Sequence, residues 1–298
     1  NPIGSFFDKV KVGMLRLGLK STRHMPDDLS TIKALQGLGF SHSMIDRFWK
    51  PFMRGVFLEN DLSTSVRKFE ETFRLFAQGE TTLPRRGIGE IPRQMADQIP
   101  NEYIHCEQNV IKVTENSLLT EEGKEWQGRA VVLATDFGIT NQFLGVEGSD
   151  VKWNAVDCLY FVLPENELPF KMPILHLDGS AEGPINNLTF VSTLCECAPD
   201  GMALASASVM GRQDLAIDEL VKSSRKQLVS WFGESSKSWE NIQNYRIKRA
   251  VPSCSAPKDL EMKINGIYRC GDYLGLPSID SAMRSGRKVA ESILESSF

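Results

Sequence analysis

The sequence has few of the residues that hold metals or build disulfide frameworks. Among 298 residues there are six cysteines and four histidines, with no Cys-x-x-Cys and no His-x-x-x-His pair. No serine stands in a Gly-x-Ser-x-Gly pattern either. We therefore expect no metal site, no disulfide scaffold and no serine hydrolase chemistry, and the scattered cysteines favour a reducing, intracellular compartment.

Long hydrophobic runs and excess positive charge are also missing. No apolar stretch approaches the roughly 20 residues of a transmembrane helix, and the start of the chain shows no secretory pattern. The net charge of −4 argues against nucleic acid as a partner, since phosphate binding demands a basic face. With 41% hydrophobic residues, the chain can bury one large core or two smaller ones.

The most informative segment that is present lies near the end, at residues 266–287. Residues 267–270 suit a buried strand, Gly271-Asp272 allows a turn, and Ser278 can cap a helix. The first turn of a helix offers unpaired N–H groups and partial positive charge, which attract phosphates and polyols. Asp272 would accept hydrogen bonds from ligand hydroxyls. The alternative is an ordinary strand, loop and capped helix.

This segment resembles the C-terminal flavin-binding motif of the amine oxidase and phytoene desaturase superfamily. In that motif a Gly-Asp is followed by Pro-Ser-Ile-x-x-Ala and then by Ser-Gly-Arg, as in residues 271–287 here. Further stretches are similar to family segments. They are residues 48–57, 84–99, 109–112, 130–135, 186–187, 198–201 and 250–252.

The resemblance implies FAD as cofactor and hydride transfer to flavin as the chemistry. It places the adenine beside the backbone of one strand residue and the riboflavin half at the C-terminal corner. The cofactor-binding residues that it implies are Val110, Gly271, Asp272, Pro277, Ser278, Ile279, Asp280 and Ala282. It implies no particular catalytic side chain, because the cofactor carries the difficult step.

One family feature is absent. The sequence contains no Gly-x-Gly-x-x-Gly, the fingerprint that holds the pyrophosphate of a dinucleotide on the first helix. We therefore expect the chain to be a fragment, a processed piece or a truncated product that lacks the first dinucleotide-binding unit. The alternative function is a noncatalytic remnant or interaction domain that no longer holds FAD.

The order of predicted elements indicates a mixed α/β fold with two interleaved domains. Helical spacing fills residues 5–79, and a helix is expected at 88–98. Short apolar runs predict strands at 103–106, 110–113, 117–120, 130–134, 158–163, 174–177, 188–193 and 204–209, followed by a helix at 215–232.

By family analogy, a partial Rossmann-like FAD domain comprises residues 84–150 and 251–298. A substrate domain of a sheet plus helices comprises residues 1–83 and 151–250. The resemblance implies a small apolar or amine-bearing substrate, and the aromatic-rich residues 48–76 favour a long apolar one such as a polyene. It also allows a plastid location and peripheral contact with a membrane, and it leaves the oligomeric state open.

Overall fold

The structure is a computed structural model that describes residues 3–18, 22–146, 152–253 and 260–296. The chain forms two compact units, and each unit is assembled from two separate stretches of sequence. One unit comprises Asn1–Ala96 with Trp153–Val251, and the other comprises Asp97–Lys152 with Pro252–Phe298. The first change between units falls after Ala96, so the helix before Asp97 belongs to the first unit.

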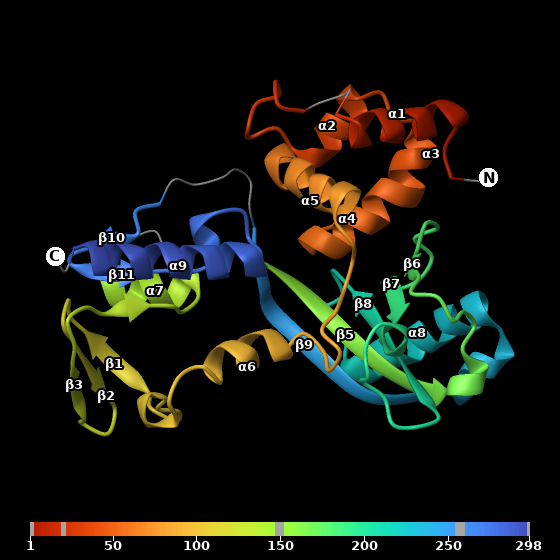
Figure 1. Ribbon diagram of the computed structural model, residues 1–298. Coiled ribbons are helices and arrows are strands. Elements are labelled where there is room, and N and C mark those ends of the chain that lie inside the picture. The colour runs from red at the N-terminus through yellow and green to blue at the C-terminus, as the bar shows by residue number, and fades with distance from the viewer. Residues whose placement is uncertain (1–2, 19–21, 147–151, 254–259, 297–298) are drawn as a thin grey trace. The chain divides into compact units, whose positions relative to one another are not determined.

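Helices make up the first part of the first unit (Figure 1). They are α1 (Phe6–Arg16), α2 (Thr31–Gly37), α3 (His42–Met44), the π-helical turn η1 (Ile45–Trp49), α4 (Lys50–Phe57), α5 (Val66–Gln78) and α6 (Glu90–Ala96). Trp49 is fully buried at the centre of their core. Its ring meets Phe40 and Phe69 edge to face, with centroids 5.4 and 5.5 Å away. Aromatic burial of this kind holds the helices together.

A five-stranded sheet forms the second part of the first unit, in the order β6-β7-β8-β5-β9. The strands are β5 (Trp153–Pro164), β6 (Leu175–Leu177), β7 (Ile185–Phe190), β8 (Met202–Val209) and β9 (Glu240–Pro252). Burial alternates along β8, where Ala203, Ala205, Ala207 and Val209 are buried. These side chains share a core with Leu220 and Leu228 of α8 (Ile217–Phe232). The helix therefore covers one face of the sheet.

Helix α4 packs against strand β7 within this unit, and the two lie side by side in Figure 1. The approach is close at Gly55, where an added Cβ would lie 2.8 Å from Oδ1 of Asn187. The side chain of Asn186 donates a hydrogen bond to the Pro51 carbonyl at 2.8 Å. A small residue and one amide thus fix the helix on the strand.

In its described residues, the second unit contains two small sheets and two α-helices. Strands β1 (Val110–Val113), β2 (Ser117–Thr120) and β3 (Glu125–Gln127) form an antiparallel sheet. The other sheet has the order β10-β11-β4 and comprises β10 (Lys263–Ile264), β11 (Ile267–Arg269) and β4 (Val132–Leu133). The helices are α7 (Phe137–Leu144) and α9 (Ile279–Glu295). Strands β11 and β4 are parallel, which is the Rossmann-like element of the fold.

The mixed α/β class is confirmed, and most predicted elements are present. One prediction is wrong, because residues 103–106 form no strand; the turn η2 (Asn101–Tyr103) ends there. Strands β3, β9 and β10 and helix α7 were not predicted. In β9, most residues are exposed or half-buried, so the strand lacks the apolar run that would have indicated it.

Candidate functional site

The predicted corner exists in the second unit, where β11 leads through the turn η6 (Asp272–Leu274) to the first turn of α9 (Figure 1). The pairing of β11 with β4 fixes its position, with Tyr268 opposite Val132 and Arg269 opposite Leu133. Because a parallel strand ends here against a helix N-terminus, the corner has the general form of a nucleotide or polyol site.

Gly271 is required in this corner because a tyrosine ring fills the space beside it. A Cβ at this position would lie 2.2 Å from Cε1 of Tyr273. The backbone of Gly271 is extended, so the need for glycine comes from this contact alone. The Tyr273 ring is buried and packs against Phe137 at a centroid distance of 5.0 Å.

The hydroxyl of Tyr273 is anchored inside the unit. It lies 3.1 Å from the Cys270 carbonyl and 3.3 Å from Oγ1 of Thr140. Burial raises the pKa of Tyr273, against the smaller opposing effects of Thr140 and Arg269. The phenol is therefore neutral at pH 7 and serves as a structural support beneath the turn.

Ser285 ties the end of β11 to α9. Its Oγ accepts a hydrogen bond from the Gly271 amide at 2.9 Å, and it lies 3.0 Å from the Gly271 carbonyl and 2.8 Å from the Ala282 carbonyl. A hydroxyl has one proton, so it donates to one of these two carbonyls at a time. The buried serine thus holds strand and helix in register.

The first turn of α9 presents backbone amides. Ser278 is the N-cap as predicted, and its Oγ accepts a hydrogen bond from the Ser281 amide at 3.0 Å. The first intrahelical bond runs from the Ala282 amide to the Ser278 carbonyl at 3.1 Å. The amides of Ile279 and Asp280 precede that bond and therefore have no acceptor within the helix. Together with the helix dipole they favour a negative or carbonyl group at this end.

The structure brings the C-terminal candidates into one corner, namely Gly271, Asp272, Pro277, Ser278, Ile279, Asp280 and Ala282. Asp272 is half-buried and begins η6. The Asp280 carboxylate is exposed and pairs with Arg284 at 2.7 Å, which leaves its backbone amide as its contribution to the corner. Val110 lies apart from this segment in the sequence, at the start of β1 in the antiparallel sheet, opposite Thr120.

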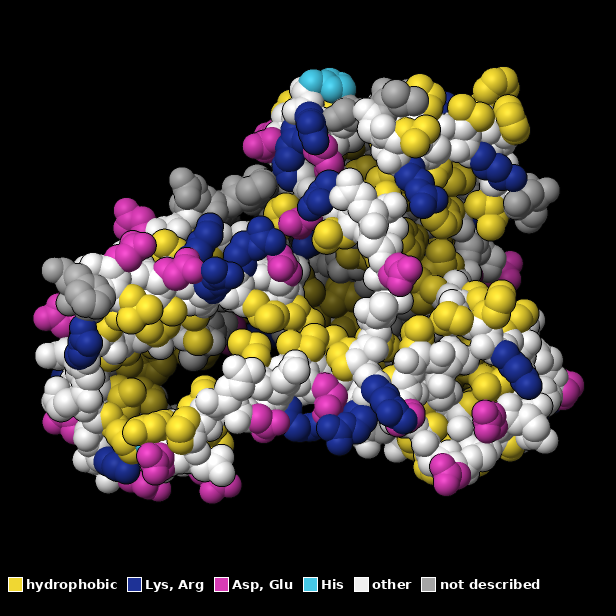
Figure 2. Space-filling model, viewed as in Figure 1, with side chains coloured by type: hydrophobic (Ala, Val, Ile, Leu, Met, Phe, Trp, Pro, Cys, Tyr) yellow, Lys and Arg dark blue, Asp and Glu magenta, His cyan; other side chains and the backbone are white. Residues whose placement is uncertain are grey.

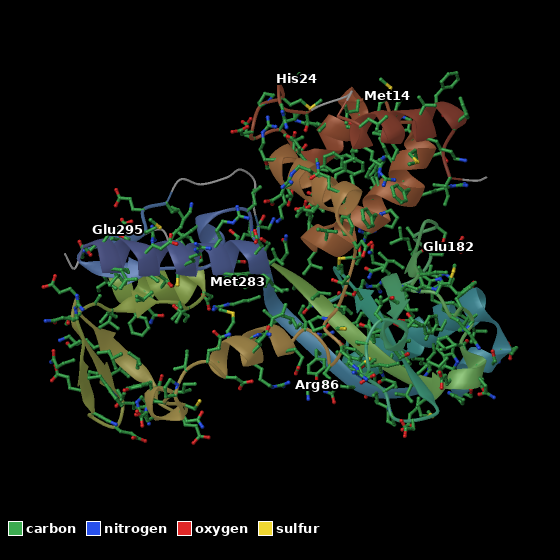
Figure 3. All side chains as sticks on the ribbon, viewed as in Figure 1. Met14, His24, Arg86, Glu182, Met283 and Glu295 are labelled. Atoms are coloured by element: carbon green, nitrogen blue, oxygen red, sulfur yellow. The ribbon has the colours of Figure 1, made fainter. Side chains whose placement is uncertain are left out.

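Two apolar side chains of the last helix are exposed. Ile279 and Met283 are 55% and 45% accessible; Figure 3 shows Met283 projecting from α9. Only Val289 and Ser285 of this helix are buried. The exposed pair provides an apolar surface beside the amides of the first turn.

The corner presents the kinds of group that the sequence resemblance assigns to the riboflavin half of FAD. It combines a half-buried carboxylate, two backbone amides at a helix N-terminus and an exposed apolar surface. The space beside Gly271 holds the ring of Tyr273.

Sequence reasoning missed the residues that support the corner. Tyr273 directly follows Gly271-Asp272, so a bulky side chain after a glycine was an available signal. Ser285 stands in the Ser-Gly-Arg of the motif, but its contact with Gly271, 14 residues away, was not predicted; Thr140 gave no signal, because its partner is 133 residues distant in the sequence. Arg269 was also missed; it is buried and donates to the Glu261 carbonyl at 2.7 Å.

The surface of α9 carries charges of both signs, and Figure 2 shows Lys and Arg side chains beside Asp and Glu side chains over this helix. Arg287 pairs with Glu291 at 2.8 Å, so part of this charge is neutralised locally. In the described ranges, no three His, Cys, Asp or Glu side chains converge as a metal site would require. None of the helices in those ranges combines the length and the hydropathy that crossing a membrane demands.

Comparison with solved structures shows a similar fold in longer chains. An oxidoreductase from Methanosarcina mazei is 15% identical with a TM-score of 0.76, over 96% of this chain and 73% of the other. Putrescine oxidase bound to putrescine is 12% identical with a TM-score of 0.72, over 98% and 76%. Reduced UDP-galactopyranose mutase is 12% identical with a TM-score of 0.61, over 90% and 67%.

Comparison of sequences identifies the family. No curated protein matches the chain. The sequence profile described as "Flavin containing amine oxidoreductase", however, matches residues 4–294, which is nearly the whole chain and includes both units. The protein therefore belongs to the flavin-containing amine oxidoreductase family, whose cofactor is FAD.

Proposed function

We propose that this protein is an FAD-dependent oxidoreductase that takes a hydride from a small amine-bearing or apolar molecule. The observation that carries the proposal is the Gly271–Ala282 corner, in a chain whose family match spans residues 4–294. The fold alone does not decide the reaction, because a UDP-galactopyranose mutase has a similar fold. The family match supports oxidation.

Each residue of the corner receives a role in this proposal. Asp272 accepts hydrogen bonds from the ribityl hydroxyls, and the amides of Ile279 and Asp280 face the carbonyl end of the ring system. When bound, FAD supplies the hydride acceptor. The positive end of the α9 dipole then stabilises negative charge that develops near these amides. Val110 is proposed to contact the adenine through its backbone.

The sheet of the first unit supports an amine-bearing substrate. Tyr160 of β5 and Tyr245 of β9 meet edge to face, with centroids 6.0 Å apart and planes at 90°. Burial raises the pKa of Tyr160, with Cys158 adding to the effect, so the ring is a neutral phenol at pH 7. Two perpendicular aromatic rings suit a cationic or apolar group. We propose this pair as the substrate contact.

A long apolar substrate has less support. The aromatic-rich residues 48–76 favoured a polyene, but Trp49 and Phe69 are buried in the helical core and Phe48 stacks on Phe52 at 5.6 Å. Those rings stabilise the unit itself. The desaturase-type function, and with it a plastid location, rests on the sequence resemblance.

The visible spectrum of the purified protein tests the proposal. Bound oxidised flavin absorbs visible light at about 450 nm. The ratio of this absorbance to protein absorbance, measured after added FAD is removed by gel filtration, reports retention. We expect Asp272→Ala to weaken FAD binding about tenfold, as loss of hydrogen bonds to a carboxylate would.

The matched control is Asp280→Ala, which removes an exposed carboxylate of the same corner but keeps its backbone amide. This variant should retain FAD like the parent chain. A protein that takes up no FAD would favour the noncatalytic alternative. If the two variants retain FAD equally, Asp272 is not part of the binding site. Loss of the visible absorbance of the bound flavin when an amine is added under anaerobic conditions would support the proposed oxidation.

A further inference from the structure

Two cysteines lie close together in the loop that joins β7 to β8 (Figure 1). Cys195 and Cys197 follow the turn η4 (Val191–Thr193), and neither is disulfide-bonded. Both residues are half-buried, whereas Glu196 between them is exposed. The loop belongs to the first unit and the flavin corner to the second. The first unit therefore carries a pair of partly accessible thiols that the proposed oxidation does not use.

The backbone between the two cysteines is folded into a tight turn. The Cys197 amide donates a hydrogen bond to the Cys195 carbonyl at 3.0 Å, which is the i→i+2 bond of a γ-turn. In an extended strand, Cα atoms at this spacing lie about 6.6 Å apart. That distance is near the upper end of the roughly 4.4–6.8 Å that a disulfide spans. Because the turn folds the chain back, it brings the two Cα atoms well within this range.

The side chains and the neighbouring segments complete the approach. The thiols of Cys195 and Cys197 are hydrogen-bond partners. The Cys195 amide and Sγ both donate to the Val191 carbonyl, at 3.0 and 3.4 Å. Glu196 is held by Arg85, whose carbonyl accepts from the Glu196 amide at 2.6 Å and whose guanidinium pairs with the carboxylate at 2.5 Å. The turn is thus anchored on two sides, with its thiols in contact.

The two thiols have different roles in disulfide exchange, because only a thiolate attacks a disulfide. Burial, and then the neighbouring Cys195 thiol, raises the pKa of Cys197 to about 12. Cys197 is therefore protonated at neutral pH. Cys195 is the residue that attacks first, and Cys197 is the residue that completes the bond.

We propose that Cys195 and Cys197 form a redox modification site that reacts with oxidised glutathione. The Cys195 thiolate attacks one sulfur of oxidised glutathione, which breaks the S–S bond, forms a mixed disulfide and releases one glutathione thiolate. Cys197 then loses its proton and attacks the Cys195 sulfur, which closes the protein disulfide and releases the second glutathione. Two cysteines are oxidised and one glutathione disulfide is reduced to two thiols.

The proposed bond is reversible. A disulfide that closes so short a ring on an accessible loop belongs to the strained and easily reduced class, which is regulatory and not structural. A metal site needs further ligands, and among the described residues no three His, Cys, Asp or Glu side chains converge around this pair or elsewhere. The chemistry of the pair is therefore that of a dithiol.

Thiol mapping of the whole protein in glutathione redox buffers tests the site. Free thiols are trapped by acid and alkylation, and trypsin then releases residues 172–212, which contain Cys195 and Cys197 and no other cysteine. We expect this peptide to escape alkylation in oxidising buffers and to be lighter than its reduced form by two hydrogen atoms. Two alkylated thiols in the most oxidising buffer would overturn the proposal. Stable glutathione adducts, or linkage to a cysteine elsewhere or in a second copy, would also overturn it.

Single variants separate the two roles. Cys197→Ser should trap Cys195 as a mixed disulfide with glutathione, because the second thiol is missing. Cys195→Ser should form its adduct at Cys197 about tenfold more slowly, because burial keeps that thiol protonated. Equal rates of adduct formation in the two variants would overturn the assigned order of attack.

The matched control is Cys106→Ser, which removes an exposed cysteine of the second unit. This variant should oxidise at residues 172–212 like the parent protein, and a loss of that oxidation would overturn the proposal. Circular dichroism checks that each variant is folded, and the mapping of the parent protein decides the proposal where a variant is not. None of these readouts requires flavin, so they are independent of the proposed oxidation.

Discussion

At the residue scale, two glycines near the C-terminus differ in what surrounds them. Gly271 has the Tyr273 ring where a Cβ would be, whereas a Cβ at Gly286, in the interior of α9, would meet nothing within 4 Å. The same substitution should therefore have opposite effects at the two positions. Whether the substitution raises or lowers the free energy of unfolding depends on the contact that the structure shows at each glycine.

We expect Gly271→Ala to lower the free energy of unfolding by about 1–3 kcal/mol, because the buried ring must move. Gly286→Ala should raise it by about 0.5–1 kcal/mol, because alanine is the better helix former. Urea denaturation of both variants measures these changes. If the two substitutions changed the free energy of unfolding equally, the Tyr273 ring would have to move freely, which would contradict its burial in the structure.

The sequence pattern predicted some features of the candidate site but not others. The pattern from Gly271 to Ala282 predicted the cap at Ser278 and the location of the corner, because capping and turn formation depend on neighbours in sequence. It could not predict Ser285 or Thr140, whose partners are brought together only by packing. The exposure of Ile279 was also outside its reach, since periodicity cannot tell which apolar positions a neighbour will cover.

At the element scale, a buried carboxylate joins two helix N-termini. Asp8 of α1 accepts hydrogen bonds from the amide of Ser5, the N-cap of α1, at 2.7 Å and from the amide and hydroxyl of Ser41, the N-cap of α3, at 2.9 and 2.7 Å. Burial raises the pKa of Asp8, but the hydrogen bonds from Ser41 and Ser5 outweigh it and hold the pKa well below its ordinary value.

This arrangement predicts an acid-sensitive contribution to stability. An unfolded aspartate has a pKa of about 3.9. Because the folded pKa is lower, the contribution is fully present above that pH and is lost as the pH falls towards the folded pKa. In Asp8→Asn, the free energy of unfolding should decline less steeply below roughly pH 4 than in the parent protein. Near neutral pH the substitution should lower the free energy of unfolding by about 1.5–3 kcal/mol.

Urea denaturation over a pH series checks this prediction. Asp46→Asn is the control, because Asp46 is an exposed helical residue paired with Lys50 at 2.6 Å and such pairs contribute about 0.3–0.5 kcal/mol. An acid profile of Asp8→Asn that coincides with that of the parent protein would show that the buried carboxylate does not titrate below its normal range.

Secondary structure was predictable where the pattern was local and strong. Helix α8 and strands β1, β2 and β8 follow from periodicity in residues 110–232. Strand β9 was missed because few of its side chains are buried, and its place depends on pairing with β5. Pairing partners distant in sequence leave little local signal.

At the scale of the whole molecule, each unit has its own cores. In the first unit, Leu188 is buried among the strands and α8. In the second unit, Val289 of α9 is buried with Tyr268 and Cys270. Separate cores permit separate opening, because local stability depends on the contacts within each cooperative unit.

Hydrogen exchange should therefore report the two units separately. Val289→Ala should speed exchange in β11 and α9 but leave β8 unchanged, whereas Leu188→Ala should speed exchange in β7 and β8 with a loss of about 2.7–5 kcal/mol. Exchange measured by mass spectrometry on peptides from each unit tests this. Equal acceleration throughout the chain after either substitution would show that the molecule unfolds as a single cooperative body.

The sequence by itself determined the family, the mixed fold class and the capped helix at the end of the chain. These follow from residues close together in the chain, where capping, turn chemistry and periodicity act. Tertiary structure alone decided that Gly271 makes room for Tyr273, that Ser285 joins β11 to α9, and that Arg85 anchors the turn at Glu196. The reason is physical: contacts between distant segments depend on how helices and strands pack, and packing leaves no fixed spacing in the sequence.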